Sequence, residues 1–290
     1  MTEHLAFFGK GGVGTSTLIS NIGTALVEAG FRVLLIGCSL EGDSFGILNV
    51  GIPIPTLWDQ YSKYGAITFD SVVTRGFKDI YCIELGNTSV EQGASGTAQA
   101  LDLLLEHDLI SSLSPDFVLY DISGDQTSRV LRELSKKVGL NRIFAVTTAD
   151  FNSLLFVNSS ITALQYGDNT YVPVPFGGLI PNGIASSFEE SIIADFARHT
   201  VTHTLGKIPR SLMVRQSELY RKTVIEASPQ SNQSYFYRRL ANHIVDESRS
   251  LTIKQQPDPM ANEDLISWAH DWADRLYALE NGLVGDGAAI

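Results

Sequence analysis

Apolar residues in this chain gather in short runs that alternate with segments of helical periodicity. Short apolar runs are typical of strands buried on both faces, and apolar positions three and four residues apart are typical of amphipathic helices. The first pattern predicts strands at residues 4–8, 32–37, 79–85, 116–121, 142–147 and 176–180. The second predicts helices at residues 16–29, 97–107, 127–139, 151–166, 187–198 and 233–248.

Strands that alternate with helices in this way form a parallel sheet with crossover helices on both faces. We therefore expect an α/β fold, with a mostly parallel sheet flanked by helices on both faces. Ligands of such sheets bind at the carboxyl ends of the strands. The expected loops at 9–17, 38–44, 121–128 and 181–184 all fall at those ends.

The C-terminal part of the chain departs from this alternation. Residues 255–259 are predicted to be a linker, followed by a helix at about 262–280 whose apolar residues, including Trp268 and Trp272, share one face. We expect that helix to pack on the body, with a partner-binding surface as the alternative. The domains are therefore expected to be residues 1–254, and a linker, helix and tail at 255–290.

A glycine-rich loop, GKGGVGTST, follows the first expected strand. A phosphate-binding loop needs glycines whose backbone N–H groups close around phosphate oxygens, a lysine that reaches the β- and γ-phosphates, and a serine or threonine for Mg²⁺. The helix that follows adds its N-terminus to the anion site. This P-loop is predicted to bind the phosphates of ATP or ADP through Gly9, Lys10, Gly11, Gly12, Val13, Gly14, Thr15, Ser16 and Thr17.

Thr15 stands where the loop ordinarily has its lysine. A charge-assisted hydrogen bond contributes about 1.5–3 kcal/mol, and loss of one transition-state donor slows chemistry about a hundred- to a thousandfold. Nucleotide binding is expected to survive this loss through the backbone cradle and Mg²⁺ on Ser16, but fast hydrolysis is not. The alternative is a glycine turn that binds no ligand.

Carboxylates and one amide follow other expected strands. Asp121 ends the apolar run at 117–120, where a carboxylate can hold the Mg²⁺ shell, and Asp125 follows it in the same loop. Asp43 lies in the loop after the second strand and is predicted to join Ser16 and Asp121 at the metal, with a helix cap as the alternative. Asn182 is a candidate for hydrogen bonding to the nucleobase, with a turn asparagine as the alternative.

Composition narrows the class of protein. The 290 residues are 44% hydrophobic and carry a formal net charge of −11, which argues against broad binding to nucleic acid or to an anionic membrane. No apolar run approaches the roughly eighteen residues of a membrane span, and we expect a cytoplasmic protein. The two cysteines, Cys38 and Cys82, lie in apolar surroundings and are expected to be buried free thiols.

Seven segments together resemble the nitrogenase iron protein and its relatives, the reductase subunits of dark protochlorophyllide and chlorophyllide reduction. They are the P-loop and residues 37–44, 120–125, 178–182, 208–210, 223–226 and 240–242. The resemblance implies a P-loop NTPase homodimer that sandwiches ATP, shares a [4Fe-4S] cluster and gates electron transfer to a partner reductase. It also implies catalytic roles for Lys10, which reaches the other subunit's nucleotide, Asp43, Asp121 and Asp125, and places Pro209 and Arg210 at the nucleotide.

Four departures from that family concern functional residues of different kinds. Ala94 and Ser128 stand at the positions of the two cluster cysteines, Thr97 replaces an arginine used in partner docking, and Ser39 replaces an aspartate of the first switch. A cluster of this type is held by four thiolates. We therefore expect the [4Fe-4S] cluster to be absent.

These observations leave three functions open, besides a pseudo-enzyme that only packs against a partner. The first is a cluster-free homodimeric nucleotide switch or assembly subunit with slow or no ATP hydrolysis, which acts on a reductase-like or other protein partner. The second is an ATP-dependent reductase component that donates electrons to a nitrogenase-like or chlorophyllide-reductase-like partner. The third is a positioning or assembly ATPase of the partition and division-site class.

Overall fold

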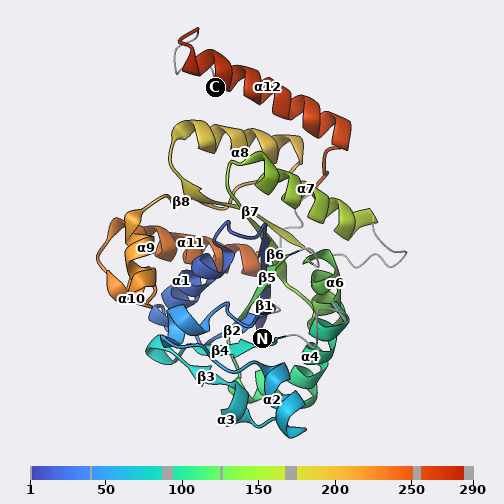
Figure 1. Cartoon of the computed structure of the whole chain (residues 1–290), viewed down its shortest axis with the longest axis vertical. Coiled ribbons are helices and arrows are strands. Elements are labelled where there is room, and N and C mark those ends of the chain that lie inside the picture. The colour runs from blue at the N-terminus through green and yellow to red at the C-terminus, as the bar shows by residue number, and fades with distance from the viewer. Residues whose placement is uncertain are drawn as a thin grey trace.

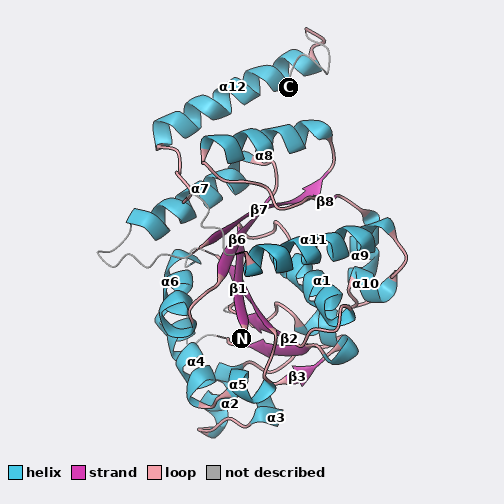
Figure 2. Ribbon diagram, turned by 180° about the vertical axis from the view of Figure 1, so that it is seen from behind, coloured by secondary structure: helices cyan, strands magenta, loops and turns pink. Residues whose placement is uncertain are grey.

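The computed structural model describes residues 2–39, 41–86, 94–124, 127–166, 175–250 and 256–283. Its centre is one eight-stranded sheet in the order β3-β4-β2-β5-β1-β6-β7-β8, drawn in magenta in Figure 2. β3 pairs antiparallel with β4, and the other pairings are parallel. The strands are β1 (Glu3–Gly9), β2 (Val33–Gly37), β3 (Thr74–Arg75), β4 (Tyr81–Glu84), β5 (Phe117–Ser123), β6 (Arg142–Thr147), β7 (Phe176–Ile184) and β8 (Ile208–Pro209).

Helices cover both faces of this sheet (Figure 1). The α-helices are α1 (Thr15–Glu28), α2 (Leu57–Tyr64), α3 (Phe69–Val72), α4 (Ala94–Glu106), α5 (Leu109–Leu113), α6 (Thr127–Val138), α7 (Phe151–Tyr166), α8 (Ser187–His199), α9 (Leu212–Leu219), α10 (Val224–Ala227), α11 (Asn232–Arg249) and α12 (Asn262–Glu280). A π-helical turn, η1 (Gly46–Val50), and a 3₁₀ turn, η2 (Phe77–Asp79), complete the described elements.

Alternate residues of the central strands feed two separate hydrophobic cores. In β1, Leu5 and Phe7 face the core under α1 and α11, whereas Ala6 and Phe8 face the core under α4, α6 and α7. All four of these side chains are fully buried. A strand covered on both faces carries no polar alternation, which explains why these segments read as continuous apolar runs.

The structure confirms the predicted α/β class with a mostly parallel sheet. Each expected strand and helix is present, with ends shifted by a few residues. The short elements β3, β8, α2, α3, α5, α9 and α10 were not predicted, because segments of this length show too little periodicity. Residues 181–184, expected to be a loop, instead belong to β7, since pairing of Asn182 with Ile208 in β8 prolongs the strand.

The C-terminal helix is fixed to α8 by a buried carboxylate. Both indole N–H groups of α12 donate to Oδ2 of Asp195, from Trp268 at 2.9 Å and from Trp272 at 2.8 Å. Arg198 and His199 contact the other oxygen, Oδ1. Burial alone would raise the pKa of Asp195, but these hydrogen bonds and cations outweigh burial and lower it.

The chain ahead of α12 is tied to the body as well. The side chain of Asn158 in α7 pairs with the backbone of Met260 in both directions, each hydrogen bond 2.9 Å long. The backbone N–H of Asp258 donates to the carbonyl of Thr200 at 2.8 Å. The described end of the expected linker is therefore a strap bound along α7 and α8. No helix in the described ranges is long and apolar enough to cross a membrane.

We predict that Asp195→Ala will release α12 from α8. The substitution leaves two buried indole N–H groups without an acceptor, at a cost of about 1–3 kcal/mol each, so the free energy of unfolding should fall by about 2–6 kcal/mol. The released tryptophans should shift the fluorescence to the red and expose the strap to protease. Asp271→Ala is the matched control, because Asp271 is exposed and lines the same pocket between α8 and α12 as Asp195. Equal effects of both substitutions would contradict the prediction.

Candidate functional site

The P-loop joins the end of β1 to the start of α1. Gly14, the residue before α1, has a φ of 87°, in the left-handed region that side chains disfavour. The side-chain amide of Asn182 donates to the carbonyl of Val13 at 2.7 Å and so holds the loop from the side of β7. The backbone N–H groups at the start of α1 have no helical partners and suit an anion.

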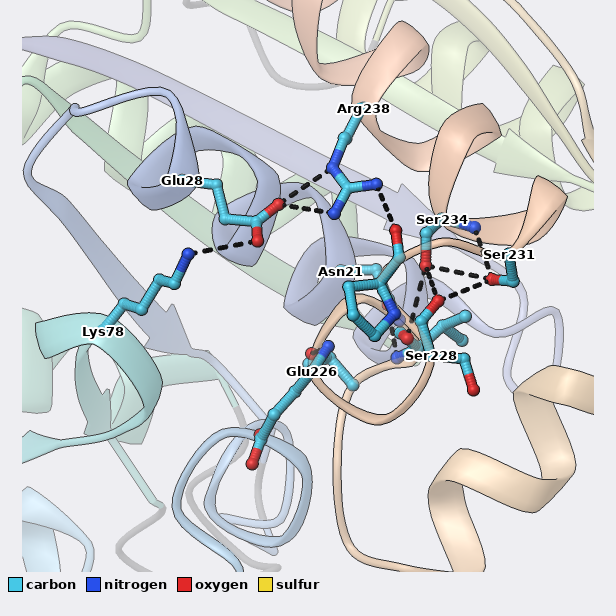
Figure 3. Close-up of polar contacts among 11 residues, drawn as sticks. Asn21, Glu28, Lys78, Glu226, Ser228, Ser231, Ser234 and Arg238 are labelled. Carbon is cyan, nitrogen blue, oxygen red and sulfur yellow. Dashed lines mark hydrogen bonds and ion pairs between the residues drawn. The ribbon is translucent and has the colours of Figure 1, made fainter.

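Helix α1 is braced at its far end, which fixes the direction in which its N-terminus points. Figure 3 shows Lys78 and Arg238 approaching the carboxylate of Glu28 from different sides. Arg238 donates from two nitrogens, each 2.9 Å away, and Lys78 lies at 3.2 Å. Burial alone would raise the pKa of Glu28, but the hydrogen bonds from both cations outweigh it and lower the pKa. Near the middle of α1, Asn21 accepts the N–H of Val224 at 2.8 Å and ties α10 to the same helix.

Two residues predicted to hold the metal meet directly. The hydroxyl of Ser16, in the first turn of α1, donates to Oδ2 of Asp121 at 2.6 Å. Asp121 is fully buried in β5, and its other oxygen, Oδ1, has no hydrogen-bond partner. Burial raises the pKa of Asp121 to about 6, against the lowering effect of the Ser16 hydroxyl. A buried carboxylate with a free oxygen beside a serine fits the oxygen-ligand chemistry of Mg²⁺.

The third predicted metal residue, Asp43, is exposed on the loop that leaves β2. Its carboxylate accepts the hydroxyl of Ser39 at 3.0 Å, and that hydroxyl also accepts the N–H of Glu41 at 3.1 Å. The charge of Asp43 raises the pKa of Asp121. Asp43 therefore lies close enough to Asp121 to act on its charge.

A further carboxylate, Glu84, lies at this edge of the sheet and was not predicted. It is the last residue of β4, is fully buried, and accepts the N–H of Phe45 at 2.7 Å. Burial, with a smaller contribution from the charge of Asp121, raises the pKa of Glu84 to about 7. The available signal was one acidic residue within the apolar run 80–85, because buried glutamate is rare without a partner.

The residues predicted to contact the nucleotide beyond the loop also gather near β7. Pro209 ends β8, and the N–H of Arg210 donates to the carbonyl of Ile184 at 2.9 Å. Arg210 itself is exposed. Because one N–H of the Asn182 amide is engaged on the loop, its oxygen and its second N–H are left for a base.

Lys10 and Thr15 occupy different environments within the loop. Lys10 is exposed at its outer side. Thr15 is buried, with its hydroxyl 2.8 Å from the place where a Cβ on Gly9 would stand. This short side chain therefore packs under the loop. Asp125, predicted to be catalytic, lies outside the described residues.

Neither cysteine is placed as a ligand of an exposed cluster. Cys38 and Cys82 are buried free thiols, as predicted. Burial raises the pKa of both thiols far above the ordinary value. Burial therefore opposes formation of the thiolate, which is the form that binds iron. Of the two residues at the expected cluster positions, Ala94 begins α4 and Ser128 lies half-buried in α6.

Comparison with known proteins identifies the family to which this sequence is similar. Residues 3–273 match the model of the NifH/frxC family, described as 4Fe-4S iron sulfur cluster binding proteins. The nitrogenase iron protein 2 of Paenibacillus durus is 34% identical over 99% of this chain and 97% of its own length. The nitrogenase iron protein of Methanospirillum hungatei is 32% identical over 93% of this chain and 96% of its own length.

Solved structures share the fold at lower identity. A ParA family ATPase from Chlorobium tepidum has a TM-score of 0.66 and 18% identity, over 84% of this chain and 99% of its own. The septum site-determining protein MinD of Pyrococcus horikoshii, solved with Mg-ADP, has a TM-score of 0.64 and 21% identity, over 84% and 96%. At such identities the likeness concerns the fold alone.

We predict that Glu84 makes the stability of the ligand-free protein fall as pH rises. Its folded pKa of about 7 exceeds the ordinary 4.5, so between these pH values the folded chain keeps a proton that the unfolded chain releases. The free energy of unfolding therefore decreases across this window, by up to about 3 kcal/mol from this group. Urea unfolding at pH 4.5, 6 and 7.5 should show Glu84→Gln gaining on the wild type as pH rises; a constant difference would contradict the assignment.

Proposed function

Because the chain belongs to the NifH/frxC family, whose members are nucleotide-binding P-loop ATPases, we propose that it is a homodimeric, cluster-free nucleotide switch or assembly subunit. It binds ATP or ADP with Mg²⁺ and hydrolyses ATP slowly or not at all. The observation that carries the proposal is the pairing of Ser16 with buried Asp121 beneath the P-loop, which leaves one carboxylate oxygen free at the metal position.

Each retained residue has a defined task in nucleotide binding. The backbone N–H groups of the loop and of the first turn of α1 bind phosphate oxygens, and Asn182 keeps that cradle in shape. Ser16 and Asp121 are the residues that would hold Mg²⁺, with Asp43 facing them from the loop after β2. When bound, Mg²⁺ neutralises phosphate charge and orients the phosphates. Lys10 supplies a cation at the exposed side of the loop.

The weak step in this site is hydrolysis. The hydroxyl of Thr15 packs inward toward Gly9, and a threonine has no cation to place on the β- and γ-phosphates. Binding retains the N–H cradle and the metal, whereas the transition state loses a charge that would stabilise it. Loss of one such donor costs about a hundred- to a thousandfold in rate, which supports a switch that turns over slowly.

The residues that this chain offers do not fit a conventional [4Fe-4S] cluster. Alanine at position 94 has no donor atom, and the serine at 128 would have to bind as an alkoxide. Cys38 and Cys82, both buried with raised pKa values, are not available as substitutes. These features disfavour the reductase alternative.

An exposed apolar surface beside the P-loop supports the homodimer. The last turn of α9 reaches the loop through Glu218, which accepts the hydroxyl of Thr17 at 3.0 Å. Arg221, just after α9, contacts the carbonyl of Gly51 at 3.5 Å and so brings the η1 turn alongside. The large apolar side chains exposed on or beside these two segments are Ile47, Ile52, Leu212, Leu219 and Tyr220. A second copy placed there would cover them and bring its Lys10 toward the nucleotide.

The positioning-ATPase alternative shares the nucleotide chemistry and differs in the partner. MinD and ParA proteins have the same fold, which is compatible with that function but does not favour it. Nucleotide-dependent recruitment to vesicles or to DNA would support it over the switch on a protein partner. The net charge of −11 opposes binding to DNA and to anionic vesicles.

We predict that Thr15→Lys will tighten Mg-ATP binding about ten- to a hundredfold and restore measurable hydrolysis, because one charge-assisted hydrogen bond to phosphate is regained. Calorimetry, phosphate release and light scattering would follow binding, turnover and dimerisation together. Thr15→Met, of similar length without the charge, should restore neither, and Lys10→Ala should weaken binding in the dimer. Wild type that binds no nucleotide at millimolar concentration would overturn the proposed function.

We predict that anaerobically purified protein will be colourless and contain far less iron than the four atoms per dimer of one cluster. Metal analysis and visible absorption measure this directly. A double variant, Ala94→Cys with Ser128→Cys, is the matched comparison, because it supplies four thiolates per dimer on an otherwise unchanged chain. Stoichiometric iron in the wild type would refute the cluster-free assignment.

A further inference from the structure

The neighbouring strand, β2, leaves space for the side chain of Glu84. In the parallel pairing of β2 with β4, Gly37 lies opposite Glu84. A Cβ on Gly37 would stand 1.8 Å from Oε2 of Glu84, well inside van der Waals contact. Glycine at position 37 is therefore what leaves room for the carboxylate to turn inward along the edge of the sheet, where it is fully buried.

The carboxylate holds one end of the 41–45 loop, which carries Asp43. Its Oε1 accepts the N–H of Phe45 at 2.7 Å, and the phenyl ring of Phe45 is itself fully buried. The other end is held by Ser39, which bonds both the side chain of Asp43 and the N–H of Glu41. With both ends fixed, the position of Asp43 depends on the hydrogen bond made two residues later.

Three buried oxygen atoms around this loop make no hydrogen bond of ordinary geometry among the described residues. They are Ser44 Oγ, Glu84 Oε2 and Asp121 Oδ1, although the Ser44 hydroxyl lies near enough to Asp121 to lower its pKa. Buried oxygen atoms of this kind are costly unless something pairs with them. Ser44 and Glu84 both border Gly37, and Gly37 in turn pairs with Asp121 in β5. The three oxygens therefore surround the end of β2, beside the proposed metal position.

We propose that Glu84 is a positioning residue for the metal, which fixes the 41–45 loop through the N–H of Phe45 so that Asp43 faces Ser16 and Asp121. The proposal rests on the proposed Mg-nucleotide function. Glu84 itself does not touch the metal or the nucleotide. Its effect is on the Mg²⁺-dependent part of nucleotide affinity and not on the phosphate cradle, which is built by other residues.

The test separates these two parts of the affinity. ADP binding by the full-length protein is measured by calorimetry with Mg²⁺ and again with EDTA, for the wild type, Glu84→Ala and Glu84→Gln. The gain from Mg²⁺ is the factor by which Mg²⁺ raises the affinity for ADP over that measured with EDTA. Glu84→Ala should lower this gain about tenfold, the value of one strong hydrogen bond. The affinity for ADP measured with EDTA should stay within about twofold of the wild type. Glu84→Gln keeps an acceptor for the N–H of Phe45 and should restore most of the gain.

Cys82→Ala is the matched control for loss of packing. Cys82 is a fully buried residue of β4 two positions before Glu84, on the same face of the strand. It should lower stability without changing the gain from Mg²⁺. An unchanged gain in Glu84→Ala, an equal loss with EDTA, or a failure of glutamine to rescue a folded protein would each overturn the positioning role.

Hydrogen exchange tests the same contact without any ligand. Peptides that span residues 41–46 should exchange faster in Glu84→Ala than in the wild type, Glu84→Gln or Cys82→Ala. Unchanged exchange would sink the proposal even if nucleotide binds as expected. If the wild type binds no ADP under either condition, the proposed function fails separately, and the exchange result still decides whether Glu84 holds the loop.

Discussion

Parallel pairing of β1, β2, β4 and β5 fixes the positions of the two buried carboxylates of the site, Asp121 and Glu84. Backbone hydrogen bonds place Gly37 opposite both Asp121 and Glu84, and Gly9 opposite Ser123. Because side chains alternate strictly along a strand, a slip of one residue would turn each carboxylate to the other face of the sheet. The two buried cores prevent such a slip, since it would also expose an alternating set of large apolar side chains. Hydrophobic packing far from the site thereby sets the spacing of its charges.

Burial of the two carboxylates raises the energy of the site when it is empty. Asp121 and Glu84 are both removed from water, and burial raises both pKa values. Two such buried acids near one another destabilise the empty site. A divalent cation held by Asp121, as we propose, would relieve part of that cost and so favour the loaded form. A site of this kind is suited to the nucleotide switch that we propose.

The sequence predicted the long elements well, because buried strands and amphipathic helices each leave a local pattern. Ser16 and Asp121 were placed together correctly, since strand ends converge in a parallel sheet. Glu84 was missed because its importance comes from pairing with Gly37, 47 positions away in a strand whose neighbour the local pattern does not name. The hydrogen bonds of Asp195 were missed for the same reason, because their donors, Trp268 and Trp272, are more than 70 positions away in the sequence.

The contact between Gly37 and Glu84 also restricts the order in which this site can evolve. A side chain at position 37 would overlap the carboxylate of Glu84 as it now lies, and its first carbon would also crowd the Cβ of Ser44. Such a change would therefore require Glu84 to turn away from the N–H of Phe45, or to become shorter, and the 41–45 loop to shift with Ser44. We expect positions 37, 44 and 84 to vary together among descendants of this chain.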